Sequence, residues 1–161
     1  MIVITKATNE LSYVTDCVNK EFNFIDSSIK SQQSLSMEIL NHLNRIFSSI
    51  DEDDLPSTLS TYSVKCDEAN TILKKCNSNM ETYNDLKISL DNIMSYLANN
   101  NLEKSVTEIN KYNKKYKKVF AEILKNTNEI EIFVQGLAEN LKDISVSRKS
   151  SYKYDKKYGY I

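Results

Sequence analysis

The sequence predicts an all-α fold: an elongated antiparallel three-helix bundle or coiled coil whose helices run up, down and up. Three long stretches place apolar residues alternately three and four positions apart, the spacing that keeps one helix face against its neighbours. The 161 residues include only two glycines and one proline, too few for a fold with many tight turns. We expect one bundle domain over 1–146, with helices at about 5–50, 57–98 and 102–145, and a basic, tyrosine-rich tail over 147–161.

The first expected helix, about 5–50, has an apolar stripe with polar positions near its middle. Serines and glutamines at 27–34 are weak helix formers and favour a kink there, but the stripe continues beyond them, so we expect one helix. The stripe consists of Leu11, Thr15, Val18, Phe22, Ile25, Ile29, Gln32, Ser36, Ile39, Leu43, Ile46 and Ile50.

The acidic residues 51–54 and the proline that follows predict the first turn. Proline disfavours helical dihedrals at the preceding residue, and Pro56 fits the first turn of the next helix. The acidic run lacks the alternating ligands, the glycine and the distal glutamate of a calcium-binding loop. We therefore interpret it as a solvated turn.

The second expected helix, about 57–98, has the most regular stripe, in which every position except Lys87 is apolar or aromatic. Its members are Leu59, Tyr62, Cys66, Ala69, Leu73, Cys76, Met80, Tyr83, Lys87, Leu90, Met94 and Leu97. Residues 99–101 are three asparagines, which tolerate left-handed dihedrals and supply capping oxygens, so we expect the second turn there.

The third expected helix, about 102–145, has a stripe in which Asn113 and Thr127 are the polar members. The stripe runs through Leu102, Val106, Ile109, Asn113, Tyr116, Phe120, Ile123, Thr127, Ile130, Val134, Leu137, Leu141 and Ile144. Gly136 lies off the stripe; it marks either a close contact or a tolerated surface position.

An antiparallel arrangement with turns near residues 54 and 100 brings polar residues of the three helices to the same level. Lys87 then lies level with Asn113 and with Glu21, which flanks the first stripe. A buried amine needs a carboxylate and other polar partners, so we expect a structural polar layer in which Glu21 holds Lys87.

No motif predicts catalytic, cofactor-binding or metal-binding residues, and we do not expect an enzyme. His42 is the only histidine, and no nucleophile or ligand set can be linked to it by spacing. The three cysteines, Cys17, Cys66 and Cys76, lack the close pairing of zinc or redox sites, so we interpret them as reduced packing residues.

The sequence favours a protein without a membrane span that is either cytoplasmic or exported by a route that needs no cleaved signal. The formal net charge of −1 gives no overall attraction to nucleic acid or anionic membranes. No stretch reaches 18 consecutive apolar residues, and the apolar residues 1–4 are too few for a signal peptide and lack its basic start.

Two groups of residues are candidates for binding a protein partner. Ile72, Leu86 and Ile93 widen the apolar face of the second helix; they form either a groove for a partner helix or simply core. The tail tyrosines can anchor a partner, and the tail either folds back or orders on binding. These tyrosines are Tyr152, Tyr154, Tyr158 and Tyr160.

The sequence thus favours a helical protein–protein interaction module, an adaptor or chaperone that binds a helical client. Small all-helical export chaperones of bacterial flagellar and type III systems are similar in size and organisation, although no motif can be matched residue by residue. The alternative is a structural or assembly protein that self-associates, for example as a homodimer. Nucleic-acid binding through the basic stretch Lys111–Lys118 is less favoured, because its lysines map to outer helix positions and Tyr116 belongs to the stripe.

Overall fold

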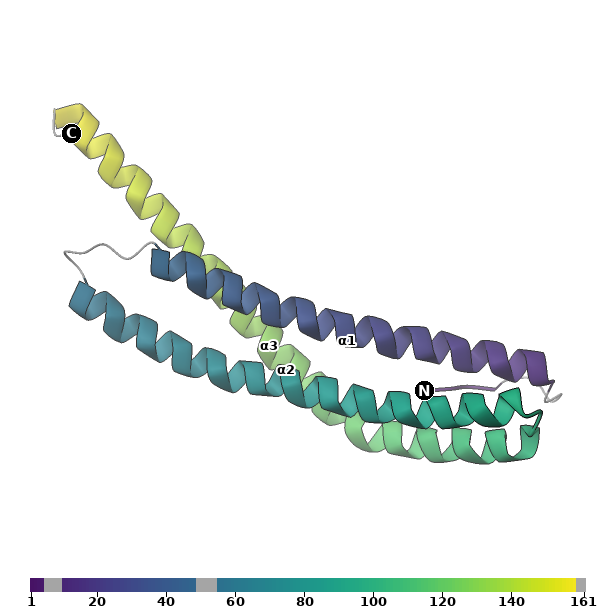
Figure 1. The fold of residues 1–161 in the computed structure, drawn as a ribbon. Coiled ribbons are helices and arrows are strands. Elements are labelled where there is room, and N and C mark those ends of the chain that lie inside the picture. Colours follow the sequence, from purple (N-terminus) through teal and green to yellow (C-terminus); the bar gives the residue numbers. More distant parts are fainter. Residues whose placement is uncertain (5–9, 49–54, 159–161) are drawn as a thin grey trace. The chain divides into compact units, whose positions relative to one another are not determined.

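The computed structural model confirms the three-helix bundle. It describes the backbone of residues 1–4, 10–48 and 55–158; side chains of 55–61, 141 and 143–158 are outside the description. The helices are α1 (Leu11–Ser48), α2 (Leu55–Ala98) and α3 (Leu102–Tyr158), shown in Figure 1. α1 is continuous through the serine-rich stretch, as expected.

The turn between α2 and α3 has the geometry that the three asparagines predict. Asn100 has a φ of 55°, in the left-handed region. Its backbone N–H donates to the carbonyl of Leu97 (3.0 Å), and the N–H of Asn101 donates to the carbonyl of Tyr96 (2.9 Å). The side-chain oxygen of Asn101 then accepts from the N–H of Lys104 at 3.2 Å and caps α3. The two backbone bonds that Asn100 and Asn101 donate at the end of α2 form a Schellman motif, in which Asn100 takes the place usually held by glycine.

Three helix boundaries differ from those expected. Residues 1–4 are not helical, and α1 begins at Leu11 instead of about 5. α2 begins at Leu55, so that Pro56 lies in its first turn, where its missing N–H has no helical partner to lose. α3 continues to Tyr158, well past 145. The apolar stripe ends at Ile144, but residues 146–158 contain no proline or glycine that would stop the helix. The acidic turn 51–54 lies outside the described residues.

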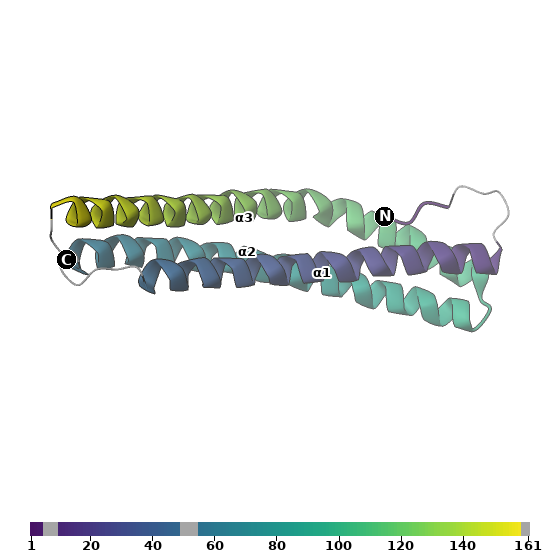
Figure 2. The same cartoon turned by 90° about the horizontal axis from the view of Figure 1, so that it is seen from above.

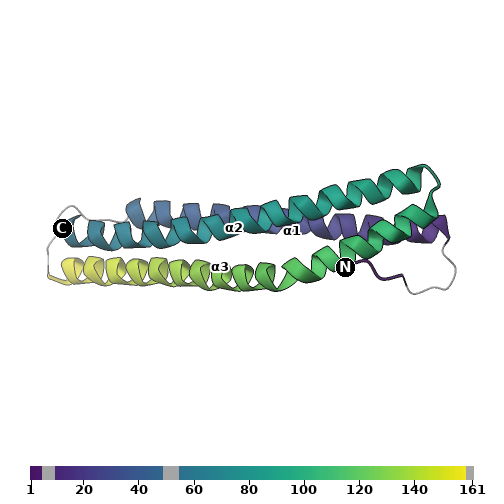
Figure 3. The ribbon, with the colours of Figure 1, turned by 90° about the horizontal axis from the view of Figure 1, so that it is seen from below.

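The helices divide into two compact units. Unit 1 contains Met1–Ser34 and Lys75–Thr127; unit 2 contains Leu35–Lys74 and Asn128–Ile161. In unit 1, Lys87 contacts Asp26 and Asn79 contacts Gln32, so α2 runs antiparallel to α1. Tyr112 contacts Glu21 and Thr127 contacts Gln32, so α3 runs parallel to α1. Figures 2 and 3 show the reversal of direction between α2 and α3.

The main hydrophobic core lies in unit 1. Its buried members are Ile2, Val14, Val18, Ile25, Tyr83, Leu86, Leu90, Ile93, Leu97, Ile109, Tyr112, Tyr116 and Ile123. In unit 2 the buried apolar side chains of the described residues are Ile39, Leu43, Ala69, Ile130 and Leu137, and the rings of Phe47 and Tyr62 pack together across α1 and α2 at 5.3 Å between centroids.

Each predicted stripe is half right. One of its two columns, which repeats every seven residues, is buried as expected: Cys76, Tyr83, Leu90 and Leu97 in α2, for example. In the three helices of unit 1 the second column lies one residue earlier than predicted, whereas Leu43, further along α1, is buried at its predicted position. Val14 and Glu21 replace Thr15 and Phe22; Asn79, Leu86 and Ile93 replace Met80, Lys87 and Met94; Ser105, Tyr112 and Asn126 replace Val106, Asn113 and Thr127.

We predict that Gly136→Ala stabilises the protein. No described atom lies within 4 Å of the place where a Cβ would stand, so alanine fits without a clash. Because glycine inside a helix costs about 1 kcal/mol relative to alanine, we expect a gain of that size and a Tm higher by about 2–4 °C. Thermal unfolding followed by circular dichroism measures it. Ala138→Gly, on the same exposed stretch, should lower the Tm by a similar amount; a lower Tm for Gly136→Ala would show that the position is packed.

Candidate functional site

The expected groove residues belong to the core. Leu86 and Ile93 are fully buried in unit 1, and Ile72 in unit 2 is partly buried. Leu86 and Ile93 therefore form no open groove, and the core alternative is the correct one for both. Of the tail tyrosines, Tyr152, Tyr154 and Tyr158 have a helical backbone, and the side chains of all four, Tyr160 included, lie outside the described residues.

The expected polar layer of Glu21, Lys87 and Asn113 is replaced by separate contacts. Lys87 pairs with Asp26 (Nζ to Oδ1 2.8 Å) and lies over the ring of Phe22 (5.2 Å to the centroid), whereas Glu21 has other partners. Asp26 is a little more than one helical turn beyond Glu21. The prediction that Glu21 holds Lys87 was therefore wrong. The turn expected near residue 54 placed Lys87 level with Glu21, whereas its partner Asp26 lies further along α1.

Glu21 is the centre of a buried hydrogen-bonded cluster in unit 1. Its carboxylate is only 8% exposed, and its Oε1 accepts from the hydroxyl of Tyr112 at 2.7 Å and pairs with the terminal ammonium of Met1 at 2.6 Å. A buried carboxylate is stable only if such donors replace water. The cluster thus compensates the one acidic side chain that α1 buries among the described residues.

Asn113 holds the N-terminal residues against α3. Its Oδ1 accepts from the backbone N–H of Ile2 at 2.9 Å, and its Nδ2 donates to the carbonyl of the same residue at 2.8 Å. Both backbone groups of Ile2 are thereby satisfied, and its side chain is buried in the core. Figure 3 shows the N-terminal residues beside the first half of α3.

The tyrosines around Glu21 are held in their neutral form. Burial raises the pKa of Tyr112 far above its ordinary value, and the neighbouring Glu21 carboxylate raises it further. Burial also raises the pKa of Tyr116, as does the charge of Glu21. For Tyr83, burial raises the pKa more than the hydrogen bond with Ser28 lowers it. These groups stabilise the packed core as neutral hydroxyls.

A second buried polar cluster joins all three helices. Asn79 of α2 donates through Nδ2 to Thr127 Oγ1 at 3.2 Å and to Gln32 Oε1 at 3.5 Å, and its Oδ1 accepts from Asn126 Nδ2 at 3.0 Å. Gln32 Nε2 donates to Thr127 Oγ1 at 3.3 Å. We call Gln32, Asn79, Asn126 and Thr127 the amide layer. Gln32 and Thr127 belonged to the predicted stripes as polar members. Asn79 and Asn126 did not, because the stripes were identified from apolar residues, so their burial was not predicted.

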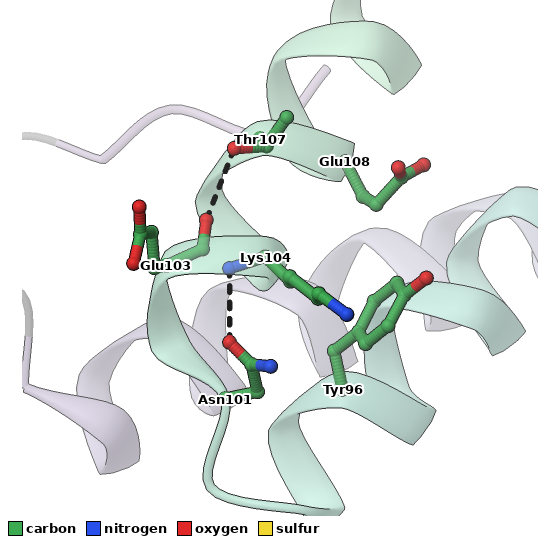
Figure 4. A pocket seen from close by; sticks show the side chains of 6 residues that line it. All are labelled: Tyr96, Asn101, Glu103, Lys104, Thr107 and Glu108. Carbon is green, nitrogen blue, oxygen red and sulfur yellow. Dashed lines mark hydrogen bonds between the residues drawn. The ribbon is translucent and has the colours of Figure 1, made fainter.

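A surface hollow lies at the start of α3 and has a volume of about 360 Å³. Figure 4 shows its lining: Tyr96, Asn101, Glu103, Lys104, Thr107 and Glu108. The ammonium of Lys104 lies 5.8 Å from the centre of the Tyr96 ring. Glu103 and Lys104 are solvent-exposed, so the hollow contains no converging buried groups that would orient a ligand. We therefore assign no ligand to it.

The single histidine and the cysteines have packing environments. His42 Nδ1 lies 2.7 Å from the carbonyl of Glu38, one turn back in α1, and its side chain is half-buried beside Leu43 of the stripe. Cys17, Cys66 and Cys76 take part in no disulfide, and Cys76 is fully buried. In the described part of the chain, no group of histidine, cysteine and acidic side chains is arranged to hold a metal ion. No helix there has both the length and the hydropathy needed to cross a membrane.

An exposed apolar row on α1 is the strongest candidate for a partner-binding site. Met37, Leu40 and Phe47 are 59%, 46% and 55% exposed, and with Asn44 they follow a spacing of three, four and three residues. We call these four residues the outer stripe of α1. The sequence contained the signal, since the same spacing that predicted the core recurs two residues before Ile39. It was overlooked because the core stripe of α1 had already been assigned.

Comparison with protein-family models, curated proteins and solved structures finds no match for this chain.

We predict that Asn79→Ala destabilises the protein by about 1–3 kcal/mol, because Asn126 and Gln32 lose a partner in a buried site. The exposed Asn77→Ala on the same helix is the control and should have little effect. Replacing Gln32, Asn79 and Asn126 together by leucine should cost much less, since no buried amide is left without its partners. Urea unfolding measures all three; a triple variant weaker than Asn79→Ala would contradict this account.

We predict that stability falls above about pH 10. A folded-state tyrosine pKa above the unfolded value of about 10 adds stability that is complete below pH 10 and is lost as the pH rises toward the folded pKa. Each such tyrosine contributes a slope of about 1.4 kcal/mol per pH unit. Tyr112→Phe should make the alkaline loss shallower, and Tyr96→Phe, on the partly exposed surface, is the control. Urea unfolding between about pH 8 and 11 tests this; equal slopes for wild type and Tyr112→Phe would refute it.

Proposed function

We propose that this chain is a non-enzymatic helical protein–protein interaction module, an adaptor or chaperone that binds a helical segment of a client protein on the outer stripe of α1. The observation that carries the proposal is the exposure of three large apolar side chains on one face of one helix, Met37, Leu40 and Phe47. Exposed apolar residues aligned in this way are typical of binding surfaces, whereas isolated ones are ordinary.

The spacing of the stripe matches the surface of a second helix. From Met37 to Phe47 it extends about 15 Å, which is close to three turns. A partner helix that packs along these turns would present its own apolar residues every three and four positions. Asn44 is the polar member of the stripe, and a polar residue in such a seam selects the register and orientation of the partner.

The rest of the described surface and core supports a binding role over a catalytic one. The buried titratable groups around Glu21 bond with each other and with the backbone, so they already have partners and serve the packing of unit 1. The three cysteines form no disulfide, which is consistent with a reducing compartment, and we propose a cytoplasmic location on that basis.

Self-association is the second candidate function. The same outer stripe can pack against its copy in a second chain, which would make the protein a coiled-coil assembly element and a homodimer. The two candidates differ in what covers Met37, Leu40 and Phe47 when the purified protein is alone in solution. A client-binding protein leaves the stripe open, and a self-associating protein covers it.

The test compares two triple variants with matched exposure. Met37→Ser, Leu40→Ser and Phe47→Ser remove the stripe; Val64→Ser, Ile88→Ser and Ile132→Ser remove apolar side chains of similar exposure on α2 and α3. Sedimentation equilibrium measures the oligomeric state, and ANS fluorescence measures open apolar surface. We expect a monomer whose ANS signal falls in the stripe variant more than in the control.

Client binding is measured by co-purification from the native host, followed by rebinding of the purified client segment. We expect the stripe variant to bind that segment at least about tenfold more weakly, because central apolar anchors each contribute more than about 1 kcal/mol. The control variant should bind as the wild type does. A tight wild-type dimer that the stripe variant dissociates would instead establish self-association, and equal binding by both variants would exclude the stripe.

A further inference from the structure

A strongly basic face lies on the outside of α3 in unit 1. The stretch 111–125 contains six lysines and one acidic residue, Glu122. All six lysines are exposed. Lys115 donates to the backbone carbonyl of Asp85 at 3.5 Å, and we call the other five the basic face: Lys111, Lys114, Lys117, Lys118 and Lys125. Lys111, Lys118 and Lys125 recur every seven residues, so they form one column along about 21 Å of the helix.

The charge of this face is only weakly compensated within the chain. Lys111 pairs with Glu108 at 3.1 Å, one turn back on the same exposed surface. The other four lysines of the basic face form no ion pair with any part of the chain that the structure describes. Since the whole chain has a formal net charge of −1, this is a local concentration of positive charge.

Apolar side chains lie along one edge of the basic face, beside Lys117. Leu124 is 52% exposed and Phe120 41% exposed, and the ring of Phe120 stacks on Tyr116 at 5.4 Å between centroids, which fixes its position. Ala121 is exposed and lies next to Leu124 and to three lysines, Lys117, Lys118 and Lys125, which are three or four positions away on the helix. Because alanine is small, the backbone of a partner can approach closely there. A solvated lysine face has no need of an exposed leucine and phenylalanine along its edge.

We propose that the basic face of α3 binds an acidic amphipathic helix of a protein partner, whose carboxylates pair with the lysines while its apolar residues cover Phe120, Ala121 and Leu124. This goes beyond the proposed function, because it concerns a different surface, in unit 1, and specifies the charge of the partner. Recurrence every seven residues matches the repeat of a packed helix. Nucleic acid fits less well, because binding bases requires several stacking rings and Phe120 is the one exposed ring on this face.

The test measures fluorescence anisotropy of the full-length protein with three labelled probes. The first is a synthetic helix of roughly 21 residues with glutamates at heptad spacing beside a leucine column. The second is a peptide of the same composition in scrambled order, and the third is a 20-mer DNA, single-stranded and duplex. We expect the patterned helix to bind about tenfold or more tightly than the scrambled peptide and either DNA, with weaker binding as NaCl rises from about 50 to 200 mM.

Two triple variants with the same change in net charge distinguish the effect of the basic face from the effect of overall charge. Lys114→Glu, Lys118→Glu and Lys125→Glu together should weaken the patterned helix at least about tenfold, since three attractive pairs become repulsive. Lys20→Glu, Lys30→Glu and Lys74→Glu change the net charge equally at exposed positions elsewhere and should leave binding nearly unchanged. Leu124→Ser should weaken binding and preserve its salt dependence.

Three outcomes would overturn the proposal. If DNA or the scrambled peptide binds as tightly as the patterned helix, the basic face is a general polyanion surface. If the control variant loses as much binding as the basic-face variant, the effect comes from net charge. If sedimentation velocity shows a wild-type dimer that the basic-face variant dissociates, a second copy of the chain occupies the face.

Discussion

The arrangement of unit 1 depends on the hydrogen bonds of the Asn79 side chain. This side chain is 1% exposed and bonds with Gln32 of α1 and with Asn126 and Thr127 of α3, so one side chain of α2 fixes the levels of both neighbours. Apolar side chains alone tolerate sliding, because leucine packs on leucine in several registers. A buried amide does not, since each wrong register leaves it without partners at a cost of about 1–3 kcal/mol. The amide layer therefore selects one register among several of similar hydrophobic gain.

The fold class, the number of helices and the second turn could be predicted because each has a strong local signal. Repeated apolar spacing defined the helices, and three consecutive asparagines gave both the left-handed residue and the cap. The inner register could not be predicted by the same means. Glu21, Asn79, Ser105 and Asn126 occupy buried positions of the second column, and a search for apolar residues moves past each of them to the residue beside it.

The candidate binding sites were mispredicted for a related reason, because apolar spacing does not tell whether a helix face is buried or exposed. Leu86 and Ile93 were expected as surplus apolar residues only because the stripe of α2 had been placed one residue late; with the correct column they are core. The outer stripe of α1 was missed because it repeats the helical spacing on a second face. Whether an apolar row is core or surface depends on which way the helix faces, and that is set by contacts between residues far apart in the sequence, such as Gln32 with Thr127.

The short connection between α2 and α3 has a consequence for the order of folding. Because only residues 99–101 separate the two helices, bringing Leu97 near Ile109 closes a small loop and costs little chain entropy. The contact between Glu21 and Tyr112 joins residues 91 positions apart and costs considerably more. Local pairing is generally fast and distant pairing slow. We therefore expect contacts of α2 with α3 beside this turn to form earlier in folding than the contact of Glu21 with Tyr112.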